Sequence, residues 1–361
     1  MIDVLNHAEV TRAKSACSLE LSLTFQGLGF TIMADDSLIL EYLQDYYSGL
    51  SDCSAIMATK RLFLINTAPD FDSGNWQPVT RNKPSPLGLK EAYIDCARGR
   101  WIRKVRTDMA MFQSLADPLV IGDLHANRSQ VVNFINNQFL NHFQRQDYLL
   151  GHAAAFDIDG HTTAIAASSG GGKSTLMLRA LETKSARFLS NDRILFQPDD
   201  GEVKVLGLAK HPRVNPGTLI NSERLQHILP PEEQHRFAHM PVHELWNIEQ
   251  KYDVLIPRCY CEKKISLSGT LKNLVLLDWS LNSSKQTELN AVNIEQHPEV
   301  LEGLRKSPGP FFQNVDGQFP GSAAQSCEQY AEHLKGVRVF QLTGKTDFDR
   351  ACELLESRAI L

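Results

Sequence analysis

The sequence lacks any long hydrophobic run and contains little cysteine. No window of the 361 residues approaches the roughly 18 unbroken apolar residues that a membrane span needs. Its first residues show no basic head followed by an apolar core, so we expect no signal peptide. The seven cysteines are scattered and odd in number, which fits a reducing compartment better than a disulfide framework. We therefore expect a cytoplasmic protein that does not contact a membrane.

The chain also lacks an excess of positive charge. It has 37 lysines and arginines against 42 acidic residues, which gives a formal net charge of -5. Such a balance provides no general attraction to nucleic acid, so we expect no nucleic-acid partner. With 42% hydrophobic residues the chain can bury an ordinary core, and its length predicts two domains.

The hydrophobic pattern changes near residue 147, where we place the domain boundary. Residues 1–146 mix short strand patterns with helical ones and predict a smaller α+β domain. Its last part is a connecting helix over 129–144, with an apolar face formed by Val131, Ile135, Phe139 and Phe143. Residues 147–361 instead alternate strand, loop and helix patterns with hairpins, which is typical of an α/β nucleotide-binding domain.

Short turn sequences and a capping pattern define the elements of the second domain. Asp159-Gly160 separates "YLLGHAAAF" from "HTTAIAA", and "PDDG" at 198–201 separates two further strands. A helix is expected from about Lys173 to Leu181. The last strand, "VRVFQLTG", is followed by a helix for which Thr346 and Asp349 predict a capping box.

A glycine-rich stretch between a predicted strand and a predicted helix is the strongest motif. It matches the phosphate-loop pattern G-x-x-x-x-G-K-[ST] except that Ala167 replaces the first glycine, which a negative φ there would allow. Glycines have no Cβ, so the loop backbone can turn its N–H groups toward a phosphate, next to the positive end of the helix. The predicted nucleotide-binding residues are Ser168, Ser169, Gly170, Gly171, Gly172, Lys173, Ser174 and Thr175.

Polar residues on both sides of the loop are candidates for the chemistry. His152 lies on the hairpin strand that precedes the loop, and Asn191 and Asp192 end the strand that follows its helix. The carboxyl ends of strands beside a phosphate loop converge on the terminal phosphate. A carboxylate there can accept a hydroxyl proton or hold a metal ion, and a histidine can hydrogen-bond it or transfer the proton.

The order His152, hairpin, "SSGGGKST", helix, "FLSNDR" resembles the bacterial HPr kinase/phosphorylase family. It is most similar to the HPr kinase-related kinases (type B), which also have segments like "HPRVNPGTL" (211–219) and "VVNFINN" (131–137). The resemblance covers mainly residues 148–220. It implies an α/β fold with a P-loop kinase domain of HPr kinase type, a mixed sheet with flanking helices, preceded by a smaller α+β N-terminal domain.

The resemblance also implies roles for individual residues. Lys173 and Ser174 match the phosphate-binding lysine and the metal-binding hydroxyl, and His152 matches the active-site histidine. Asp192 matches the second aspartate of the family's pair, as catalytic residue and metal ligand, whereas the first aspartate is Asn191 here. An amide cannot accept a proton at neutral pH, so either Asp192 is the base or Asn191 only positions a ligand and the base lies elsewhere. Recognition of HPr itself is not implied.

Basic residues further along the chain are candidate phosphate or substrate contacts. Lys210 and Arg213 precede a Pro-Gly turn, and Arg258 stands before a cysteine. Arginine suits bidentate contacts to oxyanions, although a solvated loop would explain the same residues. Asp278, which ends the apolar run "NLVLLDW", is either a metal-holding acid or the cap of a buried strand.

Three hypotheses about function follow. The first is an ATP- and Mg²⁺-dependent kinase that transfers the γ-phosphoryl group to a hydroxyl of a protein or peptide serine or of a small polyol. The second is a catalytically weak nucleotide-binding regulator or scaffold, because Asn191 interrupts the acid pair. The third is an NTPase that uses Asp278 as its metal-holding acid. The family tends to form oligomers, so the resemblance also makes a homo-oligomer an expectation.

Overall fold

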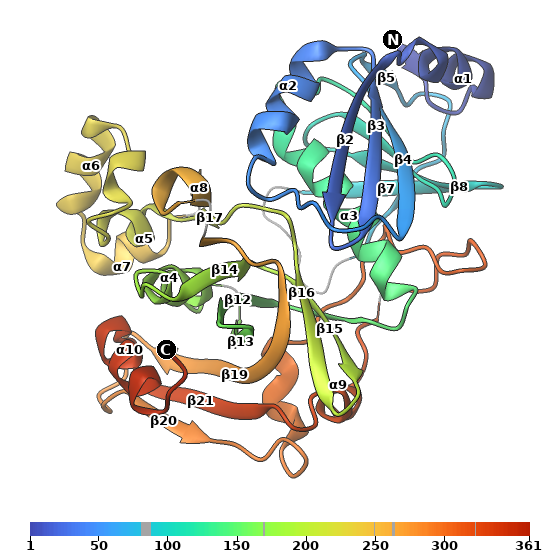
Figure 1. Cartoon of the computed structure of the whole chain (residues 1–361). Helices are drawn as coiled ribbons and strands as arrows, with labels where there is room; N and C mark the ends of the chain where they lie inside the picture. The colour runs from blue at the N-terminus through green and yellow to red at the C-terminus, as the bar shows by residue number, and fades with distance from the viewer. Residues whose placement is uncertain (81–87, 169, 249, 262–263, 322) are drawn as a thin grey trace. The chain divides into compact units, whose positions relative to one another are not determined.

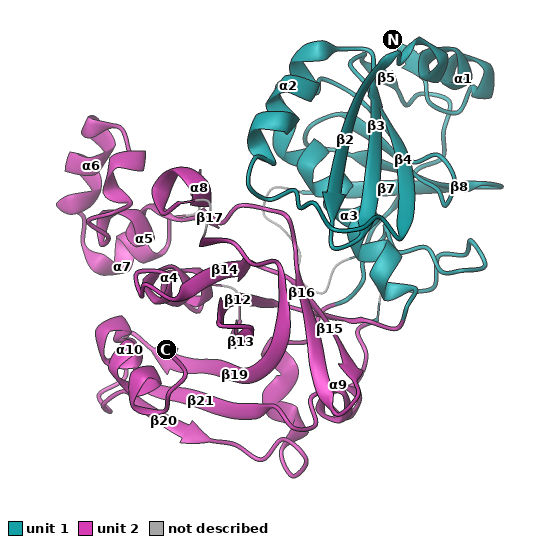
Figure 2. Cartoon of the chain, in the orientation of Figure 1, with its two compact units in different colours: residues 1–146, 307–323 teal, residues 147–306, 324–361 magenta. Residues whose placement is uncertain are grey.

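The computed structural model describes residues 1–80, 88–168, 170–248, 250–261, 264–321 and 323–361. The chain divides into two compact units, residues 1–146 with 307–323, and residues 147–306 with 324–361 (Figure 2). We expected all of 147–361 to form the second domain, but residues 307–323 belong to unit 1. Within this segment, the backbone carbonyl of Phe311 accepts a hydrogen bond from the buried side chain of Asn141.

Unit 1 is built on a mixed sheet. Its main strands are β2 (Leu19–Phe25), β3 (Leu28–Ala34), β4 (Ala58–Ile65), β6 (Gln77–Pro78), β7 (Glu91–Cys96), β8 (Gly99–Lys104), β9 (Met109–Gln113) and β10 (Leu119–Ile121). Within the described residues they run in the order β2-β3-β4-β10-β9-β8-β7-β6. β3, β4 and β10 are mutually parallel, and the other pairs are antiparallel.

In the part of unit 1 that the structure describes, three helices and a short parallel pair of strands accompany this sheet. The helices are α1 (His7–Ala16), α2 (Ser37–Tyr46) and α3 (Arg128–Gln144), and the short strands are β1 (Ile2–Asp3) and β5 (Pro69–Asp70). The helix expected over 129–144 corresponds to α3. Its predicted apolar face is buried, since Val131, Ile135, Phe139 and Phe143 are at most 6% exposed.

Unit 2 contains a second mixed sheet. Its strands are β11 (Leu149–Gly151), β12 (Ala153–Ile158), β13 (His161–Ala166), β14 (Ala186–Ser190), β15 (Ile194–Asp199), β16 (Glu202–Gly207), β19 (Ser268–Ser280), β20 (Glu288–Ala291) and β21 (Arg338–Lys345). They run in the order β11-β15-β16-β19-β13-β12-β14, and β21 pairs with both β19 and β20. The long strand β19 pairs with β16 through its first residues and with β21 through its last ones.

Four strands of this sheet end at one edge. β13, β19 and β21 are mutually parallel, and β14 points the same way because both it and β13 are antiparallel to β12. The edge at the carboxyl ends of such strands is where α/β sheets bind ligands. The glycine-rich loop leaves β13 at this edge, and Asn191 and Asp192 leave β14 there.

Two hairpin turns of unit 2 form at the Asp-Gly pairs from which the sequence predicted them. Asp159 and Gly160 both have positive φ between β12 and β13, and Asp200 and Gly201 do so between β15 and β16. Two consecutive residues of positive φ are what a two-residue hairpin turn requires. The first of these turns pairs β13 with β12 so that Ala153 lies opposite Ala166, which places His152 at the edge where β13 ends.

Helices flank this sheet and lie around the edge at which β13, β19 and β21 end (Figure 1). The loop is followed by α4 (Lys173–Ala180), against which the last helix, α10 (Phe348–Ser357), packs. The described residues between β16 and β19 form two short strands, a 3-10 helix, η1 (Gln226–Ile228), and four short α-helices. The strands and α-helices are β17 (Arg213–Val214), β18 (Tyr252–Asp253), α5 (Pro216–Ile220), α6 (Pro231–Ala238), α7 (Val242–Trp246) and α8 (Ile256–Cys259). A further helix, α9 (Cys327–His333), lies before β21.

One detail of α10 differs from the sequence prediction. The residue that caps its N-terminus is Asp347, whose carboxylate accepts a hydrogen bond from the backbone N–H of Arg350 at 3.0 Å. We expected Thr346 to cap this helix. Aspartate and threonine are both good caps, so the sequence alone did not separate two adjacent candidates. Among the described residues, no helix has the length and apolar character needed to cross a bilayer.

Candidate functional site

A large cleft opens at the carboxyl edge of the unit 2 sheet, and its lining comes entirely from unit 2. Its volume is ≈ 1830 Å³, larger than the roughly 300–1,000 Å³ of a typical small-molecule pocket. It is lined by the loop and α4, by the segment from β17 to α8, and by the start of α10. The cleft therefore has room for a nucleotide and a second ligand.

The loop backbone has the conformation that its glycines permit. Gly170 and Gly172 have φ of 81° and 93°, in the left-handed region that side chains disfavour. Ala167, at the first motif position, has no positive φ, as its side chain requires, and it is buried. A Cβ added at Gly171 would lie 2.8 Å from the Cβ of Ala167. The alanine is therefore compatible with the loop, but it makes the glycine opposite it necessary.

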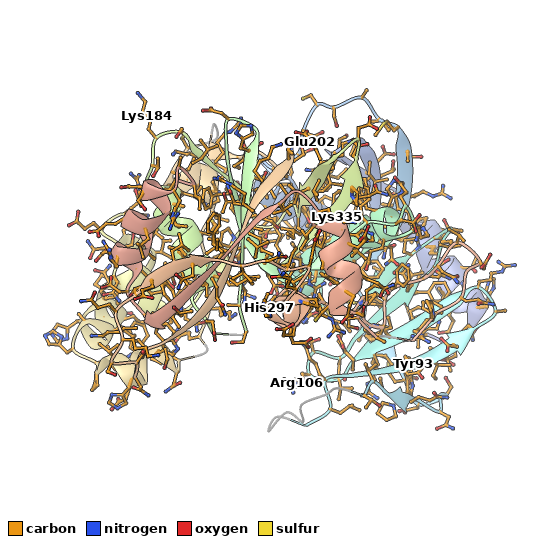
Figure 3. The ribbon with its side chains drawn as sticks, turned by 90° about the horizontal axis from the view of Figure 1, so that it is seen from below. Tyr93, Arg106, Lys184, Glu202, His297 and Lys335 are labelled. Carbon is orange, nitrogen blue, oxygen red and sulfur yellow. The ribbon has the colours of Figure 1, made fainter. Side chains whose placement is uncertain are left out.

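Lys173 begins α4 and turns its side chain back over the loop. Its Nζ donates hydrogen bonds to the carbonyl oxygens of Ala167 at 2.9 Å and Ser168 at 3.1 Å. The side chain is buried, in contrast to a surface lysine such as Lys184, which points into solvent (Figure 3). Burial lowers the pKa of Lys173 to about 8, and the nearby Asp192 only partly offsets this effect. An anion beside this ammonium group would restore its charge.

The next residue of α4 meets the strand that follows the helix. The Ser174 hydroxyl donates a hydrogen bond to Oδ1 of Asn191 at 2.7 Å, and Asn191 is 9% exposed. The serine thus lies beside an amide oxygen rather than a carboxylate. Hydroxyl and amide oxygens are both ligands that Mg²⁺ accepts, but they contribute no negative charge. Any metal held here would depend on other groups for charge neutralisation.

Asp192 and His152 form a pair at the rim of the loop. Asp192 has φ of 78°, and one carboxylate oxygen lies 3.4 Å from Nε2 of His152. The other carboxylate oxygen lies 3.5 Å from Nε of Arg193. Burial raises the pKa of Asp192, but the hydrogen bond with His152 and the charges of Arg193 and Lys210 lower it by more. The pKa therefore lies well below its ordinary value, and this carboxylate stays ionised.

Two basic residues stand on the facing wall of the cleft. Burial lowers the pKa of Lys210 to about 8, and the charge of Asp192 offsets only part of this effect. Arg213, on β17, forms an ion pair with Asp253 of β18, with 3.0 Å between Nε and Oδ1. Burial raises the pKa of Asp253, and the charges of Arg213 and Lys210 counteract that effect. The segment that holds Lys210 and Arg213 thus brings two basic side chains into the same cleft as Asp192.

Most of the residues predicted from the sequence line this one cleft. They are His152, Gly170, Gly171, Gly172, Lys173, Ser174, Thr175, Asn191, Asp192, Lys210 and Arg213. Ser168 contributes its carbonyl to Lys173, and Ser169 lies outside the described residues. Arg258 was predicted as a further contact, but it lies on α8 and is not among the described residues that line the cleft.

Asp278 does not occupy the position that a metal-holding acid would need. It is exposed on β19 and accepts a hydrogen bond from the Gln341 side chain at 3.0 Å, outside the cleft. Side chains alternate along a strand, so its neighbour Trp279 is the residue that faces the loop. Trp279 donates a hydrogen bond from Nε1 to the carbonyl of Gly171 at 2.9 Å. The interpretation of Asp278 as the acid of an NTPase therefore finds no geometric support.

Trp279 and Phe348 are site residues that we did not predict. Their rings meet edge to face with centroids 5.1 Å apart, and Phe348 lines the cleft. A Cβ added at Gly172 would lie 2.9 Å from the Phe348 ring and 3.5 Å from that of Trp279. A sequence signal for Trp279 existed, because it is the next residue after Asp278 at the end of a buried strand. Nothing in the sequence indicated that Phe348 returns to the loop.

Comparisons with known proteins give distant structural likenesses only. No protein-family profile matches the chain, and no curated protein matches it. A solved structure of the Hpr(Ser) kinase/phosphatase from Coxiella burnetii is similar to it with a TM-score of 0.30 and 9% sequence identity. The match covers 58% of this chain and 90% of that one. A likeness at this level carries no conclusion about the activity of this chain.

Proposed function

We propose that this protein is an ATP- and Mg²⁺-dependent kinase that transfers the γ-phosphoryl group to a hydroxyl acceptor. The observation that carries the proposal is the convergence of a glycine loop, its buried lysine and the Asp192–His152 pair in one cleft. A buried lysine whose pKa is lowered to about 8 is stabilised by binding an anion, and the loop supplies backbone N–H groups beside it. These features together fit a triphosphate better than a neutral ligand.

Each group has a role that its surroundings support. Lys173 would neutralise charge on the β- and γ-phosphates, and the Ser174 hydroxyl with the Asn191 amide oxygen would contact the magnesium ion. Lys210 and Arg213 on the facing wall would stabilise the charge that develops on the transferred group. The phosphates themselves would supply the negative charge that neutralises the magnesium ion, since Asn191 supplies none.

The Asp192–His152 pair suits proton transfer by histidine. A carboxylate with a pKa well below its ordinary value is a weak base, so Asp192 is poorly suited to take a hydroxyl proton itself. An ionised carboxylate beside an imidazole instead orients the ring and stabilises its protonated form. We therefore assign His152 as the group that accepts the acceptor's proton and Asp192 as the group that positions it and stabilises its charge.

The acceptor is either a serine hydroxyl of a protein or peptide or a hydroxyl of a small polyol. The cleft volume beyond the loop accommodates either. The direct test is transfer of label from γ-³²P ATP in the presence of Mg²⁺, with the protein fraction and the small-molecule fraction of a cell extract offered separately. Wild type should label one of the fractions, and the isosteric variant Asp192→Asn, which removes the charge, should not.

A second candidate function is a nucleotide-binding regulator or scaffold without efficient transfer. The specific observation in its favour is Asn191, a neutral residue against the Ser174 hydroxyl at the expected metal position. Tight binding of ATP with neither transfer nor hydrolysis would support this candidate over the kinase. Absence of any binding of ATP to wild type, measured by calorimetry, would reject both.

A further inference from the structure

The direction in which a bound nucleotide runs follows from the order of strands around the loop. Asp192 leaves β14, which lies on one side of β13, whereas β19 and β21 lie on the other side. If the terminal phosphate faces Asp192 and His152, as the proposed function requires, the other end of the nucleotide points away from them. It is therefore directed over the ends of β19 and β21, where α10 begins.

An aromatic ring stands at that position. Phe348, the first residue of α10, lines the cleft and packs directly on Gly172. Its ring is partly exposed, and Trp279 supports it edge to face, so it is held in place from behind. A rigid, partly exposed ring next to a phosphate loop is a stacking surface, because every nucleobase has a π-face.

The side chain that now lies near this ring is easily displaced. The guanidinium of Arg179, in the last turn of α4, is 5.8 Å from the centroid of the Phe348 ring and pairs with the exposed Asp349. Exposed ion pairs of this kind contribute little to stability. A base can therefore lie on the ring with the arginine shifted to its edge or to its opposite face, where a guanidinium also stacks well.

We propose that Phe348 is the stacking surface for the base of the bound nucleotide. The proposal rests on the proposed function, since it requires a nucleotide in the loop. It assigns to the start of α10 a part in nucleotide selection that is separate from the phosphate contacts. Trp279 acts as a positioning residue that holds both the ring and the carbonyl of Gly171.

The test compares a ligand that has a base with one that has none. Binding of Mg²⁺–ATP and of inorganic tripolyphosphate is measured by calorimetry for wild type, Phe348→Leu and Tyr260→Leu. Tyr260 is the matched control, because it is an aromatic residue that lines the same cleft from the α8 wall. Thermal melts of the free proteins establish that each variant is folded.

The proposal expects that Phe348→Leu weakens ATP binding about tenfold or more, as loss of one stacking contact does, with tripolyphosphate affinity changed less than about twofold. Tyr260→Leu should leave both affinities near those of wild type. The assignment would be overturned if Phe348→Leu weakened the binding of both ligands equally or weakened neither. It would also be overturned if Tyr260→Leu lost more ATP affinity than Phe348→Leu. If wild type binds neither ligand, the proposed function itself fails, and the base site with it.

A second variant separates support of the loop from contact with the base. Trp279→Phe keeps an aromatic ring behind Phe348 but removes the Nε1–H that holds the Gly171 carbonyl. This variant should weaken the binding of ATP and of tripolyphosphate to a similar degree, because both ligands bind to the loop. An effect on ATP alone would contradict the division of roles between the two aromatic residues.

Discussion

Binding of a triphosphate should take up protons from solution, and the amount should depend strongly on pH. The burial of Lys173 and Lys210 lowers the pKa of each to about 8. At pH 8.5 each is therefore only about one quarter protonated, and a bound polyanion that restores the ordinary pKa would add about 0.75 proton per lysine. The pair would take up about 1.5 protons at pH 8.5 but only about 0.2 at pH 7.

The measurement is calorimetric titration with Mg²⁺–ATP in buffers of different ionisation enthalpy, since the slope of heat against that enthalpy gives the number of protons. Lys210→Arg serves as the control, because arginine remains charged at both pH values. It should reduce the uptake at pH 8.5 to about half while preserving binding. An uptake at pH 8.5 no larger than that at pH 7 would refute the reasoning, because the lysines would then be fully charged in the free protein.

The same shifts predict the sign of a stability change. A lysine with a lowered pKa in the folded state binds fewer protons there than in the unfolded state between about pH 8 and its ordinary value of 10.5. The free energy of unfolding of the nucleotide-free protein should therefore rise with pH across that window, where these lysines titrate. Denaturant titrations at a series of pH values measure it, with Lys173→Met as the comparison. If the free energy of unfolding rises with pH equally in that variant, groups other than Lys173 cause the effect.

Three further predictions concern single side chains. Asn191→Asp places a carboxylate against the Ser174 hydroxyl. It should lower the Mg²⁺ concentration needed for half-maximal activity several-fold, about the effect of one added charged ligand. An unchanged Mg²⁺ requirement would exclude Asn191 from the metal site. Gly171→Ala should abolish ATP binding, because the new Cβ would lie 2.8 Å from the Cβ of Ala167 and 3.2 Å from the Ser168 carbonyl oxygen. The double variant that adds Ala167→Gly removes the closer contact and should recover part of the binding, whereas no recovery would point to another cause. Asp157→Ala removes a fully buried carboxylate that accepts three hydrogen bonds, and should lower the free energy of unfolding by about 2–3 kcal/mol, measured by urea denaturation; a loss under about 0.5 kcal/mol would contradict that role.

Local features of the loop could be predicted because their causes are local. A run of glycines between a strand and a helix needs no distant partner to adopt positive φ, and Gly170 and Gly172 do so. The two hairpin turns of unit 2 follow from Asp-Gly pairs for the same reason. The order of strands after the loop also placed Asn191 and Asp192 near it, since carboxyl ends of parallel strands meet at one edge.

Features that depend on segments far apart in the sequence needed the tertiary structure. The aromatic support of the loop joins Gly171 to a tryptophan more than a hundred residues later, and the return of residues 307–323 to unit 1 is equally distant. The ionisation of the lysines also depends on the tertiary fold, because burial lowers the pKa of Lys173 and of Lys210. Only the packing of the folded chain decides which side chains are buried. The sequence by itself therefore determined the glycine-rich loop and its neighbouring polar residues. The fold decided which of these residues are charged, which are in contact, and which side chains lie across the cleft from them.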